Sequence, residues 1–297
     1  MKKYILILII LGVTFSSSFA QEEEADPVYA FNSGILIDAQ TSYIPDARTL
    51  EFVIQHKFGS IENGKSNLWG IYGSSNIRLG LNYVPIKNFQ IGAGITKKNM
   101  YTDFSAKWKV LQQKTSGMPI SFTLFGNVAI DGRDADLIGT GQVVDTKGQT
   151  LPKYIDFNDR LSYFSQAMVT RKFGDWAALQ AAASFTHYNM AGWDYNHDVV
   201  GLHFSGRIKF SPQGSFIFNY DKPLKIDNIT EQYTWDTHAK ENVSVGVEFF
   251  TFTHAFQIYV GSAQGILPQD MMMYNQNDWT NKKGLAIGFT ITRIWMF

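Results

Sequence analysis

From residue 49 onward, apolar and polar side chains alternate along most of the chain. The last stretch, 284–297, shows the pattern most clearly, with Leu285, Ile287 and Phe289 on one face and small or hydroxyl residues between them. Because successive side chains of a strand point to opposite faces, this stretch is predicted to be a strand with one apolar face. The same period predicts twelve strands, at 50–58, 76–83, 89–96, 102–112, 120–130, 161–172, 177–188, 199–210, 215–220, 242–252, 255–262 and 284–297.

The connections between these strands alternate in length. Short connections are predicted at 84–88, 113–119, 173–176, 211–214 and 253–254, and the others, except 97–101, are longer, at 59–75, 131–160, 189–198, 221–241 and 263–283. Transmembrane barrels have an even strand number, short periplasmic turns and longer outer loops. The chain is therefore predicted to be all-β, a single transmembrane antiparallel β-barrel of about twelve strands.

A soluble secreted β-sandwich is the alternative fold, because its strands also alternate. Aromatic side chains near the predicted strand ends favour the barrel, since membrane proteins place such side chains at the two membrane interfaces. These aromatics are Phe58, Tyr83, Phe89, Tyr101, Tyr163, Phe210, Tyr220 and Trp295.

The N-terminus has the organisation of a secretory signal peptide. Lys2 and Lys3 precede an apolar run over 4–13, and Ser18-Phe19-Ala20 forms a small-x-small cleavage site. Residues 1–20 are predicted to be removed after Ala20. Residues 21–48 are predicted to form a periplasmic extension or a plug-like segment in the barrel mouth, and 49–297 to form the barrel.

The last strand ends in aromatic residues at Trp295 and Phe297. A chain that stops in this way resembles outer-membrane barrels, in which the terminal aromatic is read by the barrel-insertion machinery. The resemblance implies two partners, the barrel-insertion machinery and outer-membrane lipid. It also implies that the protein lies in the outer membrane of a Gram-negative bacterium. Arg293 departs from the pattern, because that position of the last strand is normally apolar.

Three short stretches carry a family resemblance. TLEFVIQHKFG at 49–59, NIRLGLNY at 76–83 and FSAKWK at 104–109 resemble a family of outer-membrane β-barrel proteins of unknown function common in Bacteroidota. The resemblance implies a location and a fold, and it implies no reaction.

Charge and cysteine content narrow the function classes. The chain has 26 basic and 26 acidic residues, and loss of Lys2 and Lys3 leaves 24 against 26, a net charge near −2. This balance does not favour nucleic acid as a partner. Cysteine is absent, so neither disulfides nor thiolate chemistry is available.

Alternation places nine charged side chains on the inward face. They are Glu51, Lys57, Arg78, Asp103, Lys107, Lys109, Arg207, Lys209 and Glu248. Six bases against three acids would favour small anions if the lumen is open. Alternatively, these charges pair across the wall and fill it, and a twelve-strand barrel is intermediate between filled and open ones.

One pair of residues in the predicted strand 199–210 resembles a catalytic pair. His203 and Ser205 match the His-x-Ser of twelve-strand outer-membrane phospholipases, and Asn219 is available to orient the histidine. The flanking residues of that family are missing, so ordinary lumen wall is the preferred interpretation. His187, Asp194, His197 and Asp198 follow no recognised zinc spacing, and no catalytic residue, metal or cofactor is predicted.

The predicted outer loops carry aromatic side chains that could stack on sugar rings or anchor the barrel at the interface. They are Trp193, Tyr195, Trp235, Tyr274 and Trp279. Met271-Met272-Met273 in the last loop is predicted to pack as part of a loop lid rather than to bind copper.

Three functions remain. The first is a narrow porin-like channel or binder for small polar solutes, anions among them. The second is a closed structural or surface-interaction barrel that acts through its outer loops. The third, more remote, is a phospholipase-like hydrolase.

Overall fold

The computed structural model describes residues 25–138, 143–144, 150–151, 155–192, 194–231, 234–280 and 284–297. The predicted signal peptide, residues 21–24 of the predicted plug-like segment, and Trp193 lie outside the described residues.

Twelve antiparallel strands form a closed barrel, which confirms the predicted fold and excludes the sandwich. Each strand pairs with its neighbours along the barrel sequence, and the last strand pairs with the first, Trp295 opposite Leu50. Strand ends lie within three residues of the predicted ones. The strands are β3 (Thr49–Ser60), β4 (Asn76–Ile86), β5 (Phe89–Thr96), β6 (Thr102–Leu111), β7 (Ser121–Ile130), β10 (Leu161–Phe173), β11 (Ala177–Tyr188), β12 (Asp198–Lys209), β13 (Gly214–Pro223), β14 (Asn242–Thr251), β15 (His254–Gly261) and β16 (Ala286–Met296).

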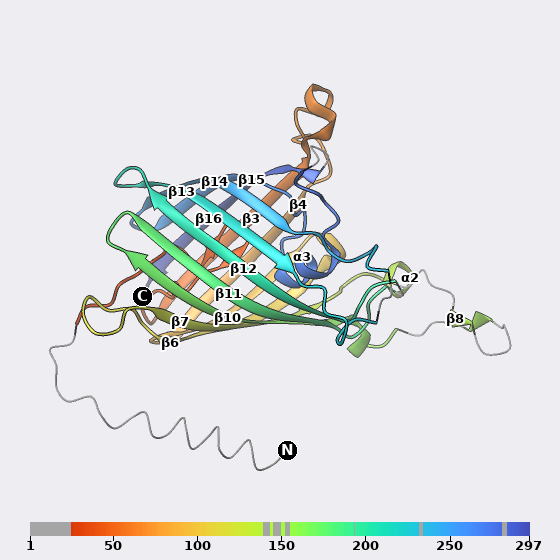
Figure 1. Cartoon of the computed structure of the whole chain (residues 1–297), viewed down its shortest axis with the longest axis horizontal. Helices are drawn as coiled ribbons and strands as arrows, with labels where there is room; N and C mark the ends of the chain where they lie inside the picture. The colour runs from red at the N-terminus through yellow and green to blue at the C-terminus, as the bar shows by residue number, and fades with distance from the viewer. Residues whose placement is uncertain are drawn as a thin grey trace, which may run out of the picture.

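The two ends of the barrel differ. One end, called the short-turn end, carries connections such as 87–88 and 174–176, and the C-terminus lies there (Figure 1). The other, the long-loop end, carries the small elements η2 (Ile61–Asn67), η3 (Lys98–Met100), α2 (Ala135–Ile138), β8 (Val143–Val144), β9 (Thr150–Leu151), η4 (Asn158–Arg160) and α3 (Pro268–Tyr274). Among the described residues, no helix is long and apolar enough to cross a membrane.

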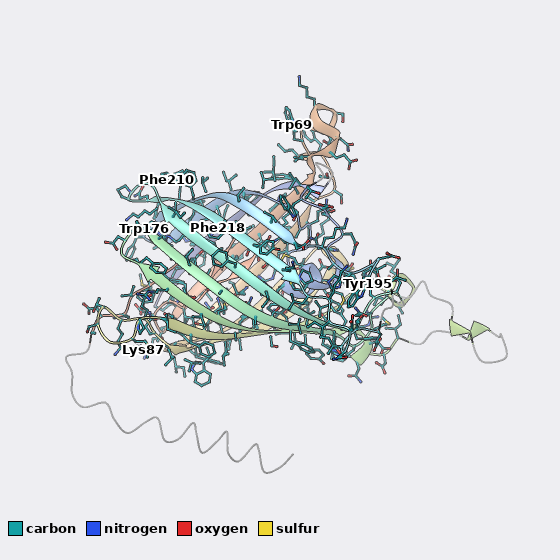
Figure 2. The ribbon with its side chains drawn as sticks, in the orientation of Figure 1. Trp69, Lys87, Trp176, Tyr195, Phe210 and Phe218 are labelled. Carbon is teal, nitrogen blue, oxygen red and sulfur yellow. The ribbon has the colours of Figure 1, made fainter. Side chains whose placement is uncertain are left out.

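The outer face of the barrel is apolar and the inner face polar. Ile95 and Ile258 are 58% and 60% exposed, whereas Asp103 and Thr290 are completely buried. This distribution is the reverse of a water-soluble sheet and suits a wall covered by lipid. Trp176 and Phe210 lie at the short-turn end, and Tyr195 lies at the long-loop end (Figure 2).

Residues 25–48, here called the N-terminal segment, lie inside the barrel. The segment enters at the short-turn end, where Val28 N donates to Gln113 O at 2.8 Å, and returns there, where Arg48 N donates to Val84 O at 2.8 Å. Between these points it forms the hairpin of β1 (Ile35–Leu36) and β2 (Ala39–Gln40). An apolar core lies between segment and wall, made of Ala30, Phe31, Leu36, Ile37, Ala178, Ile217 and Tyr259.

Candidate functional site

The lumen contains the charged residues that the alternation points inward. Seven are at most 7% exposed: Glu51, Lys57, Arg78, Asp103, Lys107, Lys109 and Glu248. Arg207 and Lys209, toward the short-turn end of β12, are less deeply buried. These side chains stay inside because the opposite face of each strand is apolar, and a one-residue slip would expose that face to the lumen.

Arg78 and Asp103 form a bidentate ion pair across β5. Arg78 Nε donates to Asp103 Oδ1 at 2.9 Å and Nη2 donates to Oδ2 at 2.6 Å, and Asn127 donates to Oδ2 at 3.1 Å. Gly94 on the intervening strand makes the pairing possible, because a Cβ there would lie 2.5 Å from Arg78 Nη2. Such a forked pair fixes the geometry of both charges.

Lys57 joins two parts of the chain that enter the lumen from opposite ends. Its Nζ donates to Asp38 Oδ2 in the N-terminal segment at 2.7 Å, and to the backbone oxygens of Ala263 and Gly265 at 2.7 and 2.8 Å. The latter belong to the β15–β16 loop, residues 262–285. All three donors of the ammonium group are therefore used.

The wall binds the N-terminal segment from several other sides. Gly34 N donates to Glu51 at 3.0 Å, and Lys107 Nζ donates to Gly34 O at 3.0 Å. Further bonds, from different strands, are Asn32 to Glu248 at 2.8 Å, Ile37 N to Gln257 at 2.7 Å and Gln180 to Gln40 O at 2.6 Å. The backbone of the segment and the buried polar groups of the wall thus satisfy each other.

The β15–β16 loop closes the lumen from the long-loop end through α3. Gln269 donates to Asn127 at 2.7 Å, and Lys98 pairs with Asp270 at 3.0 Å. Met271, Met272 and Met273 are all at most 5% exposed, as expected of a packed loop lid.

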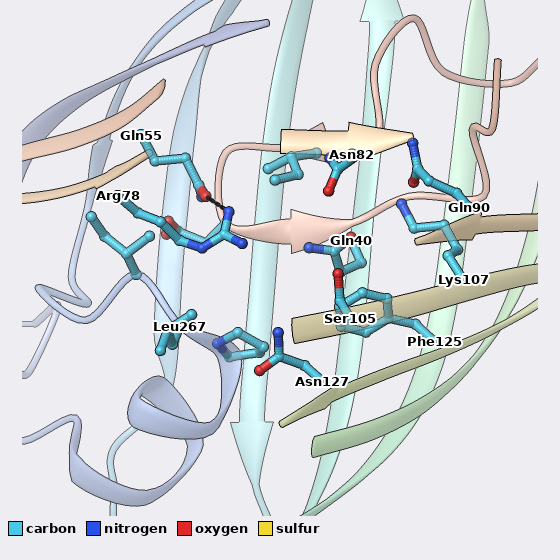
Figure 3. Close-up of a pocket in the computed structure, with 14 residues that line it drawn as sticks. Gln40, Gln55, Arg78, Asn82, Gln90, Ser105, Lys107, Phe125, Asn127 and Leu267 are labelled. Atoms are coloured by element: carbon cyan, nitrogen blue, oxygen red, sulfur yellow. Dashed lines mark hydrogen bonds between the residues drawn. The ribbon is translucent and has the colours of Figure 1, made fainter. Parts of the chain in front are cut away.

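Little space remains between these parts. Figure 3 shows the residues around a cavity between the N-terminal segment, the wall and the start of α3. Its volume is about 20 Å³, and one buried water needs about 10–15 Å³. At this level the lumen is filled, and the filling comes from the N-terminal segment and α3.

The structure corrects the charge balance predicted for the lumen. Asp38, Asp221 and Asp270 are also buried there, at 2–3% exposed, so the six bases face six acids rather than three. Asp38 and Asp270 belong to segments without strand periodicity, and Asp221 lies one residue beyond the predicted strand 215–220. The three additional acids therefore offset the excess of basic residues that suggested small anions as solutes.

The outer-loop aromatics do not all come together. Tyr195 packs on Tyr274 with ring centroids 4.9 Å apart, and Tyr274 contacts Tyr188 at 5.1 Å. Trp235 instead contacts His238 and Lys225, and Trp279 is 49% exposed. Among the four described members of the predicted set, ring contacts join only the two tyrosines.

The terminal residues lie at the short-turn end. Phe297 is 78% exposed, and the Arg293 guanidinium lies 5.0 Å from the Trp295 ring. Stacking on an aromatic at the membrane interface gives this outward arginine a partner.

His203 has a different partner from the one the sequence suggested. Its Nε2 lies 2.7 Å from Ser184 Oγ on β11, and its Nδ1 lies 2.7 Å from Asp221 Oδ1 on β13. Asn219 contacts Asp221 instead of the histidine. The hydrogen bonds of His203 thus go to Ser184 and Asp221 rather than to Ser205 or Asn219, because cross-strand neighbours are fixed by strand register, which periodicity along one strand does not reveal.

A protein family matches most of the chain. The family described as "Membrane bound beta barrel domain (DUF5777)" matches residues 31–295. The chain belongs to this family. The match begins inside the N-terminal segment, so the family's barrel domain includes most of the residues that fill the lumen.

Two solved structures align with most of this family member at low sequence identity. An outer membrane channel from Pseudomonas putida F1 is 12% identical, with 86% of this chain and 97% of that chain covered and a TM-score of 0.49. The NanC porin is 6% identical, with 84% and 99% covered and a TM-score of 0.48. Among curated proteins, none matches this chain.

Replacing Lys57 tests whether it holds the N-terminal segment in place. Asp38 lies outside the barrel strands; burial raises its pKa to about 6, and Lys57 opposes the shift. Lys57→Met should expose the segment at pH 8, because it leaves a buried carboxylate without its cation. Docking takes up a proton when the docked pKa is above the free one. Without Lys57 the docked pKa of Asp38 is higher than the parent's value of about 6, so docking should recover progressively as the pH falls through 6 toward the ordinary carboxyl value of 3.8.

The measurement is maleimide labelling of a single cysteine at Ser42, a buried residue of the segment, in a chain that otherwise has no cysteine. Lys209→Met, at the short-turn end of β12, is the matched control and should leave labelling slow. Equal labelling rates with and without the Lys57 change would contradict this role.

Proposed function

We propose that the protein is a narrow porin-like channel for small polar solutes in the outer membrane of a Gram-negative bacterium, and that the structure shows its closed form. One observation carries the proposal. The barrel is complete without its filling, because all twelve strand pairings connect strands of the wall alone. The N-terminal segment can leave without breaking any of them.

The path of the N-terminal segment supports withdrawal. Both of its ends lie at the short-turn end, so it can slide out as a loop without threading. Several of its contacts with the wall are hydrogen bonds to polar groups, which water can replace. The apolar contacts of Phe31, Leu36 and Ile37 favour the closed form, and opening has to overcome their burial.

The lumen that remains would be polar, with six bases facing five acids, because Asp38 leaves with the segment. Its wall carries carboxamide, hydroxyl and charged side chains from several strands, among them Gln55, Asn82 and Gln90 (Figure 3). Such a wall suits small hydrophilic solutes. This near balance of charges supports no strong preference for anions.

The second candidate is a closed barrel that acts through its outer loops. The filled lumen favours it, and so does the connection at 61–75, which projects sideways from the barrel and carries Trp69, 45% exposed (Figure 2). In that case removal of the N-terminal segment would produce no conductance. Deletion of residues 132–159 would abolish partner binding, and the barrel would still insert into the membrane.

Planar-bilayer recordings distinguish the two candidates. A channel should conduct once the N-terminal segment is removed, and a closed surface-interaction barrel should stay silent. Export by a signal peptide cleaved after Ala20, recognition of Trp295 and Phe297 by the insertion machinery, and a Bacteroidota source with a family-specific HKFG motif stay predictions from the sequence.

A further inference from the structure

Three side chains on adjacent strands form a serine–histidine–aspartate array in the half of the lumen toward the long-loop end. Ser184 (β11), His203 (β12) and Asp221 (β13) are 6%, 9% and 3% exposed. Both hydrogen bonds of the histidine, to Asp221 Oδ1 and Ser184 Oγ, measure 2.7 Å. We propose that this array is a catalytic site for hydrolysis of carboxylic esters with an apolar acyl group.

The aspartate is held so that it fixes the histidine. Asn219 and Asn242 each donate to Asp221 Oδ2 at 2.8 Å, which leaves Oδ1 to accept from His203 Nδ1. With its proton on Nδ1, the imidazole presents a bare Nε2 to the Ser184 hydroxyl. This is the tautomer and order of groups that serine nucleophiles require. Asp221 is therefore a positioning residue.

A second observation points to a ligand beside Ser184. Gln166 is directly opposite Ser184 in the β10–β11 register and is 6% exposed. Its side-chain oxygen is buried without a hydrogen-bond partner among the described residues. Buried amides are rarely left in this state. Rotation of this carboxamide would let its NH₂ stabilise an oxyanion formed at the carbon bound to Ser184.

The space for the acyl group is filled by α3. Gly201 lies opposite Ser184 on β12, and a Cβ there would be 2.7 Å from Ser184 Oγ and 3.1 Å from His203 Nε2. The terminal methyl of Met272 also contacts that position. The surrounding side chains are apolar, namely Phe125, Phe164, Met168, Tyr188, Val199 and Met273. An apolar acyl group can replace the Met272 side chain when α3 moves aside.

The reaction follows from this geometry. Ser184 Oγ bonds to the ester carbonyl carbon as its proton passes to His203 Nε2, and that proton then goes to the alkoxide as the ester C–O bond breaks. Water attacks the acyl-serine, gives a proton to His203 and releases the carboxylic acid, and the histidine returns the proton to Ser184. Ester and water are converted to acid and alcohol, with no other reactant.

A fluorophosphonate probe tests the nucleophile in the full-length barrel folded in lipid vesicles. The parent chain should be labelled at Ser184, identified by peptide mass spectrometry, and Met272→Ala should be labelled faster because it uncovers the site. Ser184→Ala should lose labelling, and the control Ser205→Ala, another buried serine of the lumen, should keep it. Absence of labelling in both parent and Met272→Ala, or unchanged labelling of Ser184→Ala, would overturn the proposal.

Two further variants separate catalysis from packing. With p-nitrophenyl butyrate, Asp221→Asn should lower kcat per folded barrel on the order of 10²-fold or more with KM little changed. The folded fraction is taken from the gel shift on boiling. A purely structural aspartate would leave kcat per folded barrel unchanged. In Ser184→Cys, His203 should shift the pH midpoint of iodoacetamide reactivity below about 8.5. The same midpoint in Ser184→Cys and Ser205→Cys would count against the array. Neither readout depends on whether the barrel conducts.

Discussion

Deleting residues 28–46 should convert a silent barrel into a conducting one. The full-length protein, reconstituted in planar bilayers, should show no conductance above background, because the N-terminal segment and α3 leave a cavity of about 20 Å³ between them. The deleted chain should insert and give stable single-channel steps, because the wall keeps every strand pairing and the β15–β16 loop loses the segment beside which it closes the lumen.

The control deletion removes residues 62–71 from the projecting connection between β3 and β4, which contributes nothing to the cavity lining. That variant should stay silent. Conductance of the intact chain equal to that of the 28–46 deletion would refute a channel closed by this segment. Silence of a well-folded deletion, judged by a gel shift on boiling, would instead favour the closed surface-interaction barrel.

Breaking the Arg78–Asp103 pair should give the largest loss of stability of any single substitution in the wall. Arg78→Leu leaves the Asp103 carboxylate, which is fully buried, with Asn127 as its one remaining partner among the described residues. Removing one member of a buried pair costs about 3–5 kcal/mol, and replacing both members with apolar residues costs much less. The free energy of unfolding should therefore fall by about 3–5 kcal/mol in Arg78→Leu and by less in the Arg78→Leu/Asp103→Leu double variant.

Urea titration of folding into lipid vesicles, followed by tryptophan fluorescence, measures these differences. Arg171→Leu is the matched control, since Arg171 is exposed on β10 over the Phe173 ring. It should change stability by only about 0.5 kcal/mol. A double variant less stable than Arg78→Leu would mean that the pair is not the source of the loss.

The strands of the barrel wall could be predicted from the sequence because period-two alternation is a local property. Strands β5 and β11 begin and end at the predicted residues. Strand β13 continues to Pro223, three residues beyond its predicted end at Tyr220, and includes the inward Asp221. The outward apolar face and the inward charges follow from the same alternation.

The site could not be predicted in the same way, because its contacts join residues far apart in the chain. Ile37 meets Gln257, 220 residues away, and the hairpin that carries Ile37 has two-residue strands with no periodicity to detect. His203 finds Ser184 rather than Ser205 because the register of β11 and β12 brings that serine across. Only the buried Met271-Met272-Met273 run gave a local signal for the lid.

Hydrogen–deuterium exchange of the full-length barrel in lipid tests directly whether the N-terminal segment occupies the lumen. The amides of Gly34, Ile37, Thr41 and Ser42 are hydrogen-bonded inside the barrel. They should exchange as slowly as those of the strands β3 and β16 around them. Exchange of residues 33–42 as fast as that of the projecting connection at 62–71 would contradict a lumen filled by this segment.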